Sequence, residues 1–599
     1  MKKINNLKKF DPNYLKNFIF SILFLVVICF WGRYWSQYGI DISDSGFFLH
    51  AQDRLIKNQA NGISPSYLWI GSDFLGALWL KLNPNISLHF AKTGAYILYG
   101  IIMLIGYFTL FRITKNSTQS FKVTIISYVL FGSLYIFPII NYDLAPLLPI
   151  SIILLLSTYL TKTKKDILVF FFVGVLSFII ILMRLPMLLF VFCITSLFFY
   201  KYKSLNNLFS FSIGFFITIL IFILIPTTNN LLHLYFDTLI EIIKPIIRGT
   251  IKNPRLSLFE SFNYTIKDQI FFWLRGYFRI IFVFVFLFLI HFISLKINSK
   301  KNKIIFDIII IISTLLFTYY PLEEYSFFSS INITIIQFQF IYNYILPVII
   351  FITIFYLLLE KSVYLDQIFL LFFIFILLPL GSNSFEKKLS LTYFLVLPIL
   401  YCVYNETISS NKRLLIIRQF INWLFKIFAI PVLFLVFFKS LNSPYRDLPI
   451  NKLNTEFKSV SLKNIYSTKE KVEAIDPIVN WLLINKKSNS SLLSIERTAI
   501  FNYLTGIPGV FDYPYPIYLS LNYFKSHLFL LKSSNKLPDF IIIPKVDISN
   551  PNWPIDKNPN TIPNNYKTFL NEFIISNSYN IEFETEYFQI FKRQLNSNF

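Results

Sequence analysis

The chain has 599 residues, of which 55% are hydrophobic, with 70 phenylalanines and a mean hydropathy of +0.58. The apolar residues come in blocks of about 16–22, the length that crosses about 30 Å of hydrocarbon as a helix, and not as the alternating faces of a soluble domain. The net charge of +23 is therefore attributed to basic cytoplasmic loops rather than to nucleic-acid binding. The composition predicts a polytopic membrane protein.

The apolar blocks predict about thirteen spanning helices. The first follows the basic N-terminus "MKKINNLKKF" without a small-residue cleavage site, so we expect a retained helix rather than a signal peptide. A shorter block at 66–80 is expected to form a helix lying on the membrane surface, with a further span as the alternative. The predicted spans lie near residues 17–32, 89–111, 121–140, 143–160, 166–183, 185–200, 208–226, 277–295, 303–320, 341–359, 364–380, 390–404 and 419–438.

The distribution of charge supports this arrangement. With the N-terminus in the cytoplasm, lysine and arginine collect in the predicted inner loops, except at 360–363, as the positive-inside rule requires. The outer loops hold aspartates and glutamates, and an odd number of spans places the C-terminal part outside. The sequence therefore predicts a membrane domain over 1–439, with long outer loops at 33–88 and 227–276, and an extracytoplasmic domain over 440–599.

The long outer segments have local structure of their own. The second loop contains "LLHLYFDTLIEIIKPIIRGT", whose apolar residues recur at helical spacing, which predicts a helix in the membrane interface. In the more polar tail, "SSLLSI" and "DFIIIPK" are typical of buried strands, "YKTFLNEFIISN" of a helix and "IEFETEYFQIFKR" of a strand pair. We expect the tail to form a small α/β domain.

Two aspartates, Asp41 and Asp44, follow the first span in "DISDSGFFLH", just before a predicted helix. A carboxylate at the start of a helix can accept hydrogen bonds from the free backbone N–H groups of the first turn. A carboxylate at the boundary between water and lipid can also act as a general base toward an acceptor hydroxyl. Position alone leaves both interpretations open for Asp44.

The motif at 44–49, Asp-Ser-Gly-Phe-Phe-Leu, resembles the acidic motif of the GT-C glycosyltransferases, polytopic enzymes that use polyprenyl-phosphate sugars. In that family the motif also lies in the first outer loop, and interfacial helices and an outer α/β domain follow. The tail segment "LLSIERTAIFNYLTGIPG" is similar to a stretch after the last helix of many members. Ser45 departs from the pattern, because many members have a second acid there. The resemblance implies Asp44 as the catalytic base, Asp41 in support and Asp73 as a looser match to a second first-loop acid.

Arg184 lies between two apolar runs in "FIIILMRLPMLLF". Because a charge in lipid is costly, this side chain must lie at the surface or in a polar cavity. One interpretation is a loop arginine that extends to the lipid headgroups. The other is a ligand of the donor phosphate, which the planar fork of arginine suits. The Arg-Leu-Pro step resembles one seen in the same glycosyltransferases.

Further outer residues are candidates for the same cavity. The loop "LPLGSNSFEKK" offers Ser382 and Asn383 as small polar donors that can cradle a phosphate, or it forms an ordinary turn. Tyr142 and Asp143, in a short outer turn, either line this cavity or cap the next helix. Arg248, in the second outer segment, is a candidate for a lipid pyrophosphate or for lipid headgroups.

The resulting hypothesis is an inverting transfer of a sugar from polyprenyl phosphate to a lipid or glycan acceptor, at the outer face of a bacterial inner membrane. Asp44 would deprotonate the acceptor, while Arg184 and the 381–383 loop stabilise the leaving phosphate. The scheme requires no nucleotide or metal and is compatible with a divalent cation at the acids, and the scattered histidines indicate no zinc site. One alternative is a lipid-linked glycan transporter or flippase, which would need charges near the bilayer midplane. The other is an O-antigen polymerase or ligase, which usually lacks such a tail.

Overall fold

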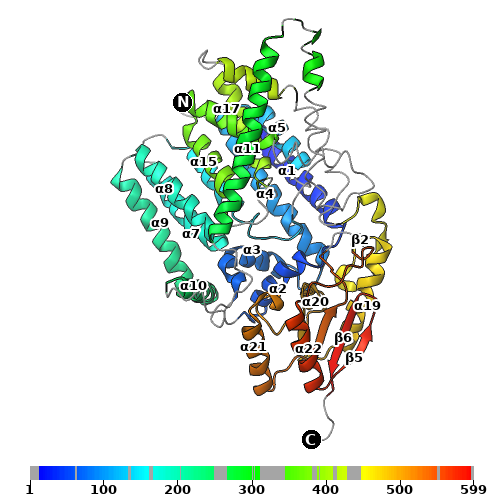
Figure 1. The fold of residues 1–599 in the computed structure, drawn as a ribbon. Helices are drawn as coiled ribbons and strands as arrows, with labels where there is room; N and C mark the ends of the chain where they lie inside the picture. Colours follow the sequence, from blue (N-terminus) through cyan, green and yellow to red (C-terminus); the bar gives the residue numbers. More distant parts are fainter. Residues whose placement is uncertain are drawn as a thin grey trace, which may run out of the picture.

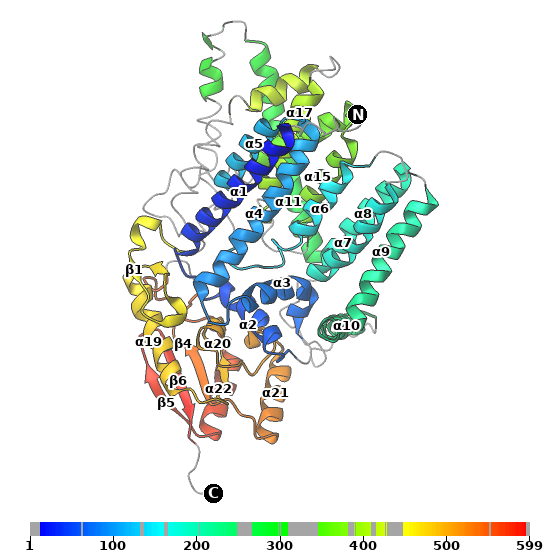
Figure 2. The same cartoon turned by 180° about the vertical axis from the view of Figure 1, so that it is seen from behind.

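The chain is mostly helical, with a bundle of apolar helices at one end and a C-terminal α/β region at the other (Figure 1). Seen from behind, the helix α1 begins at the end of the bundle that lies far from the sheet (Figure 2). The computed structural model describes residues 12–60, 64–131, 137–160, 166–202, 204–247, 266–297, 299, 301–302, 304–309, 345–380, 388–389, 391–408, 415–425, 427, 447–549 and 553–594.

Six helical segments in these ranges are long and apolar enough to cross a membrane. They are α1 (Pro12–Ser36), α4 (Leu88–Thr114), α7 (Asp166–Met183), α8 with its preceding turn (Leu185–Tyr202), α9 (Leu205–Leu224) and α11 (Ile266–Leu295). Shorter helices accompany them: α5 (Ser117–Phe131), α6 (Leu147–Ser157), α14 (Leu346–Leu359), α15 (Leu365–Leu377), α17 (Tyr393–Ile408) and Leu415–Phe425. The predicted multi-pass membrane architecture is confirmed at this level. Most of the predicted spans 303–320 and 419–438 lies outside the described residues.

The helices of the bundle pack closely where glycine allows it. A Cβ atom on Gly174 of α7 would collide with the carbonyl oxygen of Phe211 in α9, and one on Gly214 of α9 would collide with the carbonyl oxygen of Phe171. Small residues of this kind let two membrane helices approach at backbone distance. The opposite face of α9 leaves large apolar side chains such as Phe216 exposed, as expected for a surface covered by lipid.

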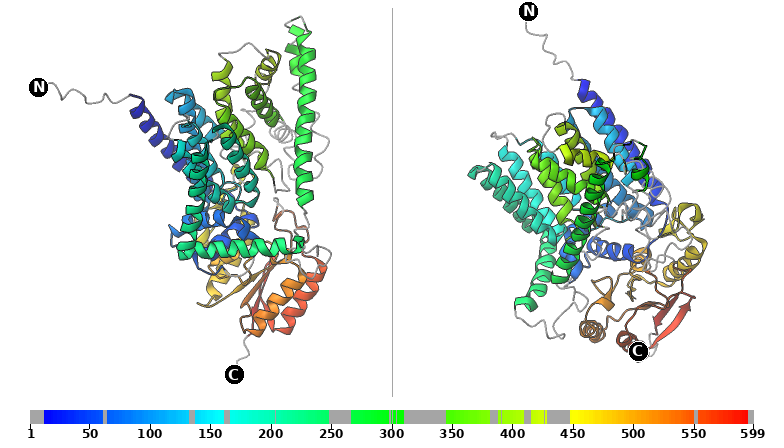
Figure 3. Two further views of the ribbon diagram at one scale, coloured as in Figure 1. Left: turned by 90° about the vertical axis from the view of Figure 1, so that its left-hand side faces the viewer. Right: turned by 45° about the horizontal axis from the view of Figure 1, so that its top comes forward.

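Two helices lie at the junction between the bundle and the C-terminal region: α2 (Asp44–Ile56) and α3 (Ile70–Lys81), which follows the short turn η1 (Pro65–Trp69). A third, α10 (Pro226–Ile247), packs against α9 and η1 at the same end of the bundle. Figure 3 (left) shows α10 running across the direction of the bundle helices, as predicted for an interfacial helix. At 12 residues, α3 is about 18 Å long and too short to span. The interpretation of 66–80 as a non-spanning helix therefore agrees with the structure.

The C-terminal region is built on a four-stranded sheet of order β3–β4–β6–β5. Its strands are β3 (Leu492–Ser494), β4 (Phe540–Pro544), β5 (Tyr579–Glu584) and β6 (Phe588–Arg593), and its helices are α19 (Lys469–Asn485), α20 (Ile500–Thr505), α21 (Leu521–Ser533) and α22 (Asn564–Ser576). A separate pair joins β1 (Thr455–Glu456) to β2 (Tyr466–Ser467). The strands β3 and β4 are parallel, and β6 pairs antiparallel with both β4 and β5. The four sheet strands and α22 lie where the sequence predicts them.

Candidate functional site

The two first-loop aspartates have different surroundings. Asp44 is the first residue of α2 and is half-buried, and the N-cap residue is Ser43, whose side chain makes no capping hydrogen bond. The Asp41 carboxylate instead accepts a hydrogen bond of 3.0 Å from the backbone N–H of Ser45. The interpretation of Asp44 as the N-cap is therefore wrong. The capping contact belongs to Asp41, which is 8% exposed.

The segment before Asp41 is fixed by buried polar side chains from two distant parts of the chain. Lys92 of α4 donates hydrogen bonds of 2.6 and 2.7 Å to the carbonyl oxygens of Tyr38 and Gly39. Asp447 accepts a bond of 2.9 Å from the backbone N–H of Ile40. A small pocket lined in part by Asp41 and Lys92 lies behind this segment. These contacts set the start of α2 relative to the membrane helices.

A close backbone contact holds α2 against the C-terminal region. A Cβ atom on Gly46 would collide with the backbone nitrogen of Ile500, the first residue of α20, and would lie 2.9 Å from its Cα. Further along α2, Arg54 forms a buried ion pair with Asp512, and His50 hydrogen-bonds the carbonyl oxygen of Phe511 at 3.0 Å. The glycine of the acidic motif is thus required by packing, because only a residue without a side chain fits at this crossing.

Aromatic rings surround the start of α2. The Phe47 ring lies 5.0 Å from that of Tyr515 and 6.0 Å from that of Trp69. The Phe48 ring lies 5.5 Å from that of Tyr142, which in turn lies 4.9 Å from Trp69. The two phenylalanines of the motif thus join rings from η1, from the turn at 141–143 and from the C-terminal region, and they lie in the first turns of α2, which begins with Asp44.

A buried charge cluster lies beside these rings. Arg184 and Asp143 are ion-paired at 3.5 Å (Nη1 to Oδ1) without a hydrogen bond, and Lys388 contacts the other carboxylate oxygen of Asp143. The second amino group of Arg184 donates to the carbonyl oxygen of Leu380 at 3.0 Å. Arg184 is 3% exposed, so it does not extend to lipid headgroups. Two buried cations therefore share one carboxylate.

This cluster is electrostatically coupled to the first loop through Tyr142. The Tyr142 ring lies 5.0 Å from the Lys388 ammonium and 5.7 Å from the Arg184 guanidinium. Lys388 lowers the pKa of the Tyr142 hydroxyl, but burial and the charges of Asp143 and Asp44 raise it above its ordinary value on balance. Burial lowers the pKa of Lys388, whereas Asp143 and Tyr142 raise it by more, so the ammonium stays charged at neutral pH.

In the turn at 141–143, one side chain binds the backbone and its neighbour pairs with the cations. Asn141 accepts hydrogen bonds from the backbone N–H groups of Asp143 and Leu144, at 2.9 and 3.0 Å. This leaves the Asp143 carboxylate for the two cations. Of the two interpretations of Asp143, the structure does not bear out capping, because Asn141 performs that role; lining a substrate cavity stays a prediction.

The C-terminal region also contributes residues near the start of α2. The Tyr515 hydroxyl donates a hydrogen bond of 2.6 Å to the carbonyl oxygen of Ser43. Burial, followed by the charges of Asp44 and Asp41, raises the pKa of Tyr515 well above its ordinary value, so the phenol stays neutral. Arg497, between β3 and α20, donates a bond of 2.9 Å to the Tyr518 hydroxyl. Sequence reasoning missed Tyr515 and Arg497 as site residues, because only the tertiary structure brings them near Asp44. Lys388 belongs to the "LPLGSNSFEKK" loop that the sequence offered as a phosphate cradle, but its pairing with Asp143 could not be predicted.

The remaining predicted site residues either do not contact this cluster or lie outside the residues that the structure describes. Asp73 is 1% exposed on α3, and its oxygens accept no hydrogen bond from the described residues. Burial raises its pKa well above the ordinary value, which favours the neutral acid over a second negative charge. Ser382, Asn383 and Arg248 lie outside the described residues.

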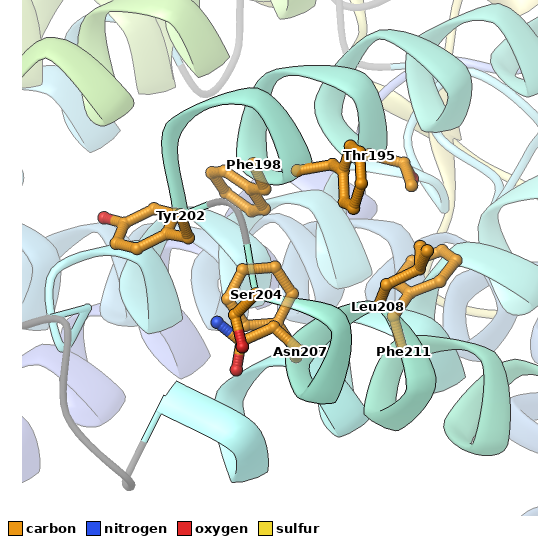
Figure 4. Close-up of a pocket in the computed structure, with 9 residues that line it drawn as sticks. Thr195, Phe198, Tyr202, Ser204, Asn207, Leu208 and Phe211 are labelled. Carbon is orange, nitrogen blue, oxygen red and sulfur yellow. The ribbon is translucent and has the colours of Figure 1, made fainter.

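A second pocket lies at the far ends of α7 and α8 from Arg184 (Figure 4). Its lining is mainly aromatic, with Thr195, Ser204 and Asn207 as the polar members, and it contains none of the candidate residues. Within the described ranges, no group of three or more histidine, cysteine and acidic side chains is arranged to hold a metal ion.

No protein-family model matches this chain, and no curated protein is significantly similar to it.

Proposed function

We propose that this protein is a membrane glycosyltransferase of the GT-C type, which transfers a sugar from a polyprenyl-phosphate donor to a lipid or glycan acceptor with inversion. The observation that carries the proposal is the pair of cations on Asp143, Arg184 and Lys388, which contact the Tyr142 ring on which the charge of Asp44 also acts. The bundle, with about thirteen spans in the proposed topology, suits a prenyl chain.

The cation pair supports the binding of a phosphate. Arg184 and Lys388 share the single charge of Asp143, so the three side chains carry an excess of one positive charge in a buried place. The Nη1 group of Arg184 makes no hydrogen bond to a described residue. A buried, unsatisfied donor is costly unless a ligand completes it, and a phosphate oxygen accepts hydrogen bonds from arginine and lysine strongly.

Asp44 suits the role of general base toward the acceptor. In the proposed step, the Asp44 carboxylate takes the proton of an acceptor hydroxyl while the acceptor oxygen forms a bond to the anomeric carbon. The bond between that carbon and the phosphate oxygen breaks on the opposite face of the sugar. The phosphate leaves with its electron pair and is stabilised by Arg184 and Lys388. The anomeric configuration inverts, and no co-reactant is consumed.

The proposed orientation follows from the distribution of charge in the sequence. The N-terminus lies in the cytoplasm, and the cluster and the C-terminal region lie on the outer face of a bacterial inner membrane, because the basic loops are expected inside. Arg184 directly follows α7, whose last residues contact α3, and α3 lies at the end of the bundle next to the C-terminal region (Figure 1). Donor and acceptor would therefore meet at the outer boundary between water and lipid, with the lipid-linked donor delivered from the membrane.

Sugar transfer in membranes that contain the wild-type chain tests this proposal. Labelled polyprenyl-phosphate sugars are supplied with a lipid and glycan extract, and Asp44→Asn is compared with wild type. Asp237→Asn, at an exposed position of α10, is the matched control. Loss of a general base should lower transfer by about 100-fold or more, with the control unchanged. Equal transfer by Asp44→Asn would remove Asp44 from its role, and no transfer by wild type with any donor would contradict the proposed function.

A further inference from the structure

Arg497 is a cation of the C-terminal region that the proposed reaction does not yet use. It follows the end of β3 directly after Glu496, which has a left-handed backbone with φ of 56°. A non-glycine residue in this conformation is strained, and such strain concentrates at functional sites. The Glu496 side chain is buried and accepts a hydrogen bond of 2.6 Å from Thr561. The buried contact of Glu496 thus stabilises the turn after β3, and this turn fixes the position of the Arg497 backbone.

The guanidinium is held by a neutral partner. Its Nε and Nη2 atoms both donate to the Tyr518 hydroxyl, at 3.3 and 2.9 Å, and it lies 5.9 Å from the centre of that ring. Among the described residues no carboxylate forms an ion pair with Arg497, and the rest of the guanidinium fork makes no hydrogen bond to them. A half-buried arginine whose hydrogen-bond partner among the described residues is a hydroxyl, and not a carboxylate, can bind an anion through the rest of its guanidinium.

Aromatic rings connect Arg497 to the start of α2 near Asp44. The Tyr515 ring lies 5.8 Å from that of Tyr518 and 5.0 Å from that of Phe47, in the first turn of α2. The Tyr515 hydroxyl reaches the carbonyl oxygen of Ser43, next to Asp44. Burial lowers the pKa of Arg497, but Tyr518, Tyr515 and Asp44 raise it above its ordinary value on balance. Arg497 and the Arg184–Lys388 pair therefore approach Asp44 from different domains.

We propose that Arg497, oriented by Tyr518, binds an acidic group of the acceptor, a carboxylate or a phosphate, so that the enzyme selects anionic over neutral acceptors. This inference rests on the proposed function for the identity of the ligand as acceptor. The donor phosphate is assigned to the membrane side, where Arg184 and Lys388 are buried beside the helix bundle. A second cation on the C-terminal side then has no donor group left to bind, and an acidic group on the acceptor accounts for it.

Direct binding tests this inference without requiring transfer. The full chain in nanodiscs is titrated, below their micelle concentrations, with octyl glucoside, octyl glucuronide and octyl glucoside 6-phosphate, which differ in the acidic group. Wild type should bind one or both acidic compounds about 10- to 100-fold more tightly than octyl glucoside, as expected for a charge-assisted pair. Arg497→Gln should abolish this preference, and Arg497→Lys should keep part of it. Lys532→Gln, an exposed cation of α21, should leave it unchanged.

The outcomes separate this inference from the proposed function. A preference that survives in Arg497→Gln, or equal binding of all three compounds to wild type, would overturn the inference even if sugar transfer is observed. In the transfer assay, Arg497→Gln should raise the KM for an acidic acceptor and leave the KM for the polyprenyl-phosphate donor unchanged. A change in the donor KM alone would overturn the assignment to the acceptor. If Arg497→Gln loses the anion preference but the wild type transfers no sugar, the anion site is supported and the glycosyltransferase proposal is contradicted.

Discussion

The backbones of Gly46 in α2 and Ile500 in α20 are in direct contact, so the helix that begins with Asp44 packs directly against the C-terminal region. The two residues are far apart in the sequence, yet a side chain on the first would collide with the main chain of the second. The contact places Arg497, just before α20, on the same side of α2 as Tyr515. The C-terminal region is thus part of the candidate site.

This contact predicts that Gly46→Ala is destabilising. The added methyl group must displace α20, and overpacking of this kind costs about 1–3 kcal/mol. Thermal unfolding in detergent should show a lower Tm, and limited proteolysis should cut between bundle and C-terminal region more readily. Gly106→Ala is the control, because its Cβ atom would lie 3.5 Å from Leu395, an ordinary contact. Equal behaviour of the two variants would contradict the packing argument.

The ion pair between Arg54 and Asp512 should be a second contact that stabilises the packing of α2 against the C-terminal region. Their side chains are 10% and 11% exposed, and Asp512→Ala would leave the Arg54 charge buried without its carboxylate. Removing one member of a buried pair typically costs about 3–5 kcal/mol. We expect a clear fall in Tm, measured as for Gly46→Ala. Glu586→Ala, which breaks the exposed pair with Lys557, should leave the Tm unchanged, and a similar effect of both substitutions would argue against a structural role for Arg54.

The buried cations predict how donor binding responds to substitution. Lys388→Gln and Arg184→Gln should each weaken binding of a polyprenyl-phosphate sugar by about 10- to 100-fold, because a charge-assisted hydrogen bond to phosphate is lost. Asp143→Asn should lower the Tm, since the cations lose their shared anion, and inorganic phosphate should restore it. Binding titrations and melting curves in nanodiscs measure these effects. Unchanged donor affinity in both glutamine variants would remove the phosphate from this cluster.

Asp73 predicts a dependence of stability on pH. Its folded pKa is raised by burial, whereas the carboxyl ionises near pH 4 in the unfolded chain. Above that pH the unfolded state binds fewer protons than the folded state, so stability falls as pH rises, by about 1.4 kcal/mol per unit, until the folded pKa is reached. Asp73→Asn, which resembles the neutral acid, should remove this loss.

Melting curves between pH 4 and pH 8 check the effect of Asp73. The Tm difference between Asp73→Asn and wild type should be small near pH 4 and should grow in favour of the variant at higher pH. Asp237→Asn, at an exposed position, should show no such trend. A constant difference across the range would mean that Asp73 is ionised in the folded protein.

Much of the architecture was accessible from local pattern. Uninterrupted apolar blocks specify membrane helices because a span must bury its backbone polar groups in its own hydrogen bonds, and α7 begins and ends where its block does. The strands β3 and β4 were recognisable as short apolar runs, since a strand buried on both faces has no polar alternation. The short helix α20, buried in the junction, lacked a repeating pattern long enough to be predicted.

The candidate site divides in the same way. The sequence by itself determined that Asp44, Arg184 and Asp143 are charges beside apolar runs, because the cost of placing a charge in lipid makes any such residue conspicuous. Only the tertiary structure decided that Arg184 and Lys388 share Asp143, that Asp41 rather than Asp44 contacts the helix backbone, and that Arg497 lies close enough to Asp44 to interact with its charge. Apart from the local contact of Asp41 with Ser45, these relationships join residues far apart in the sequence, and they arise from the packing of helices and sheet, which no local spacing records.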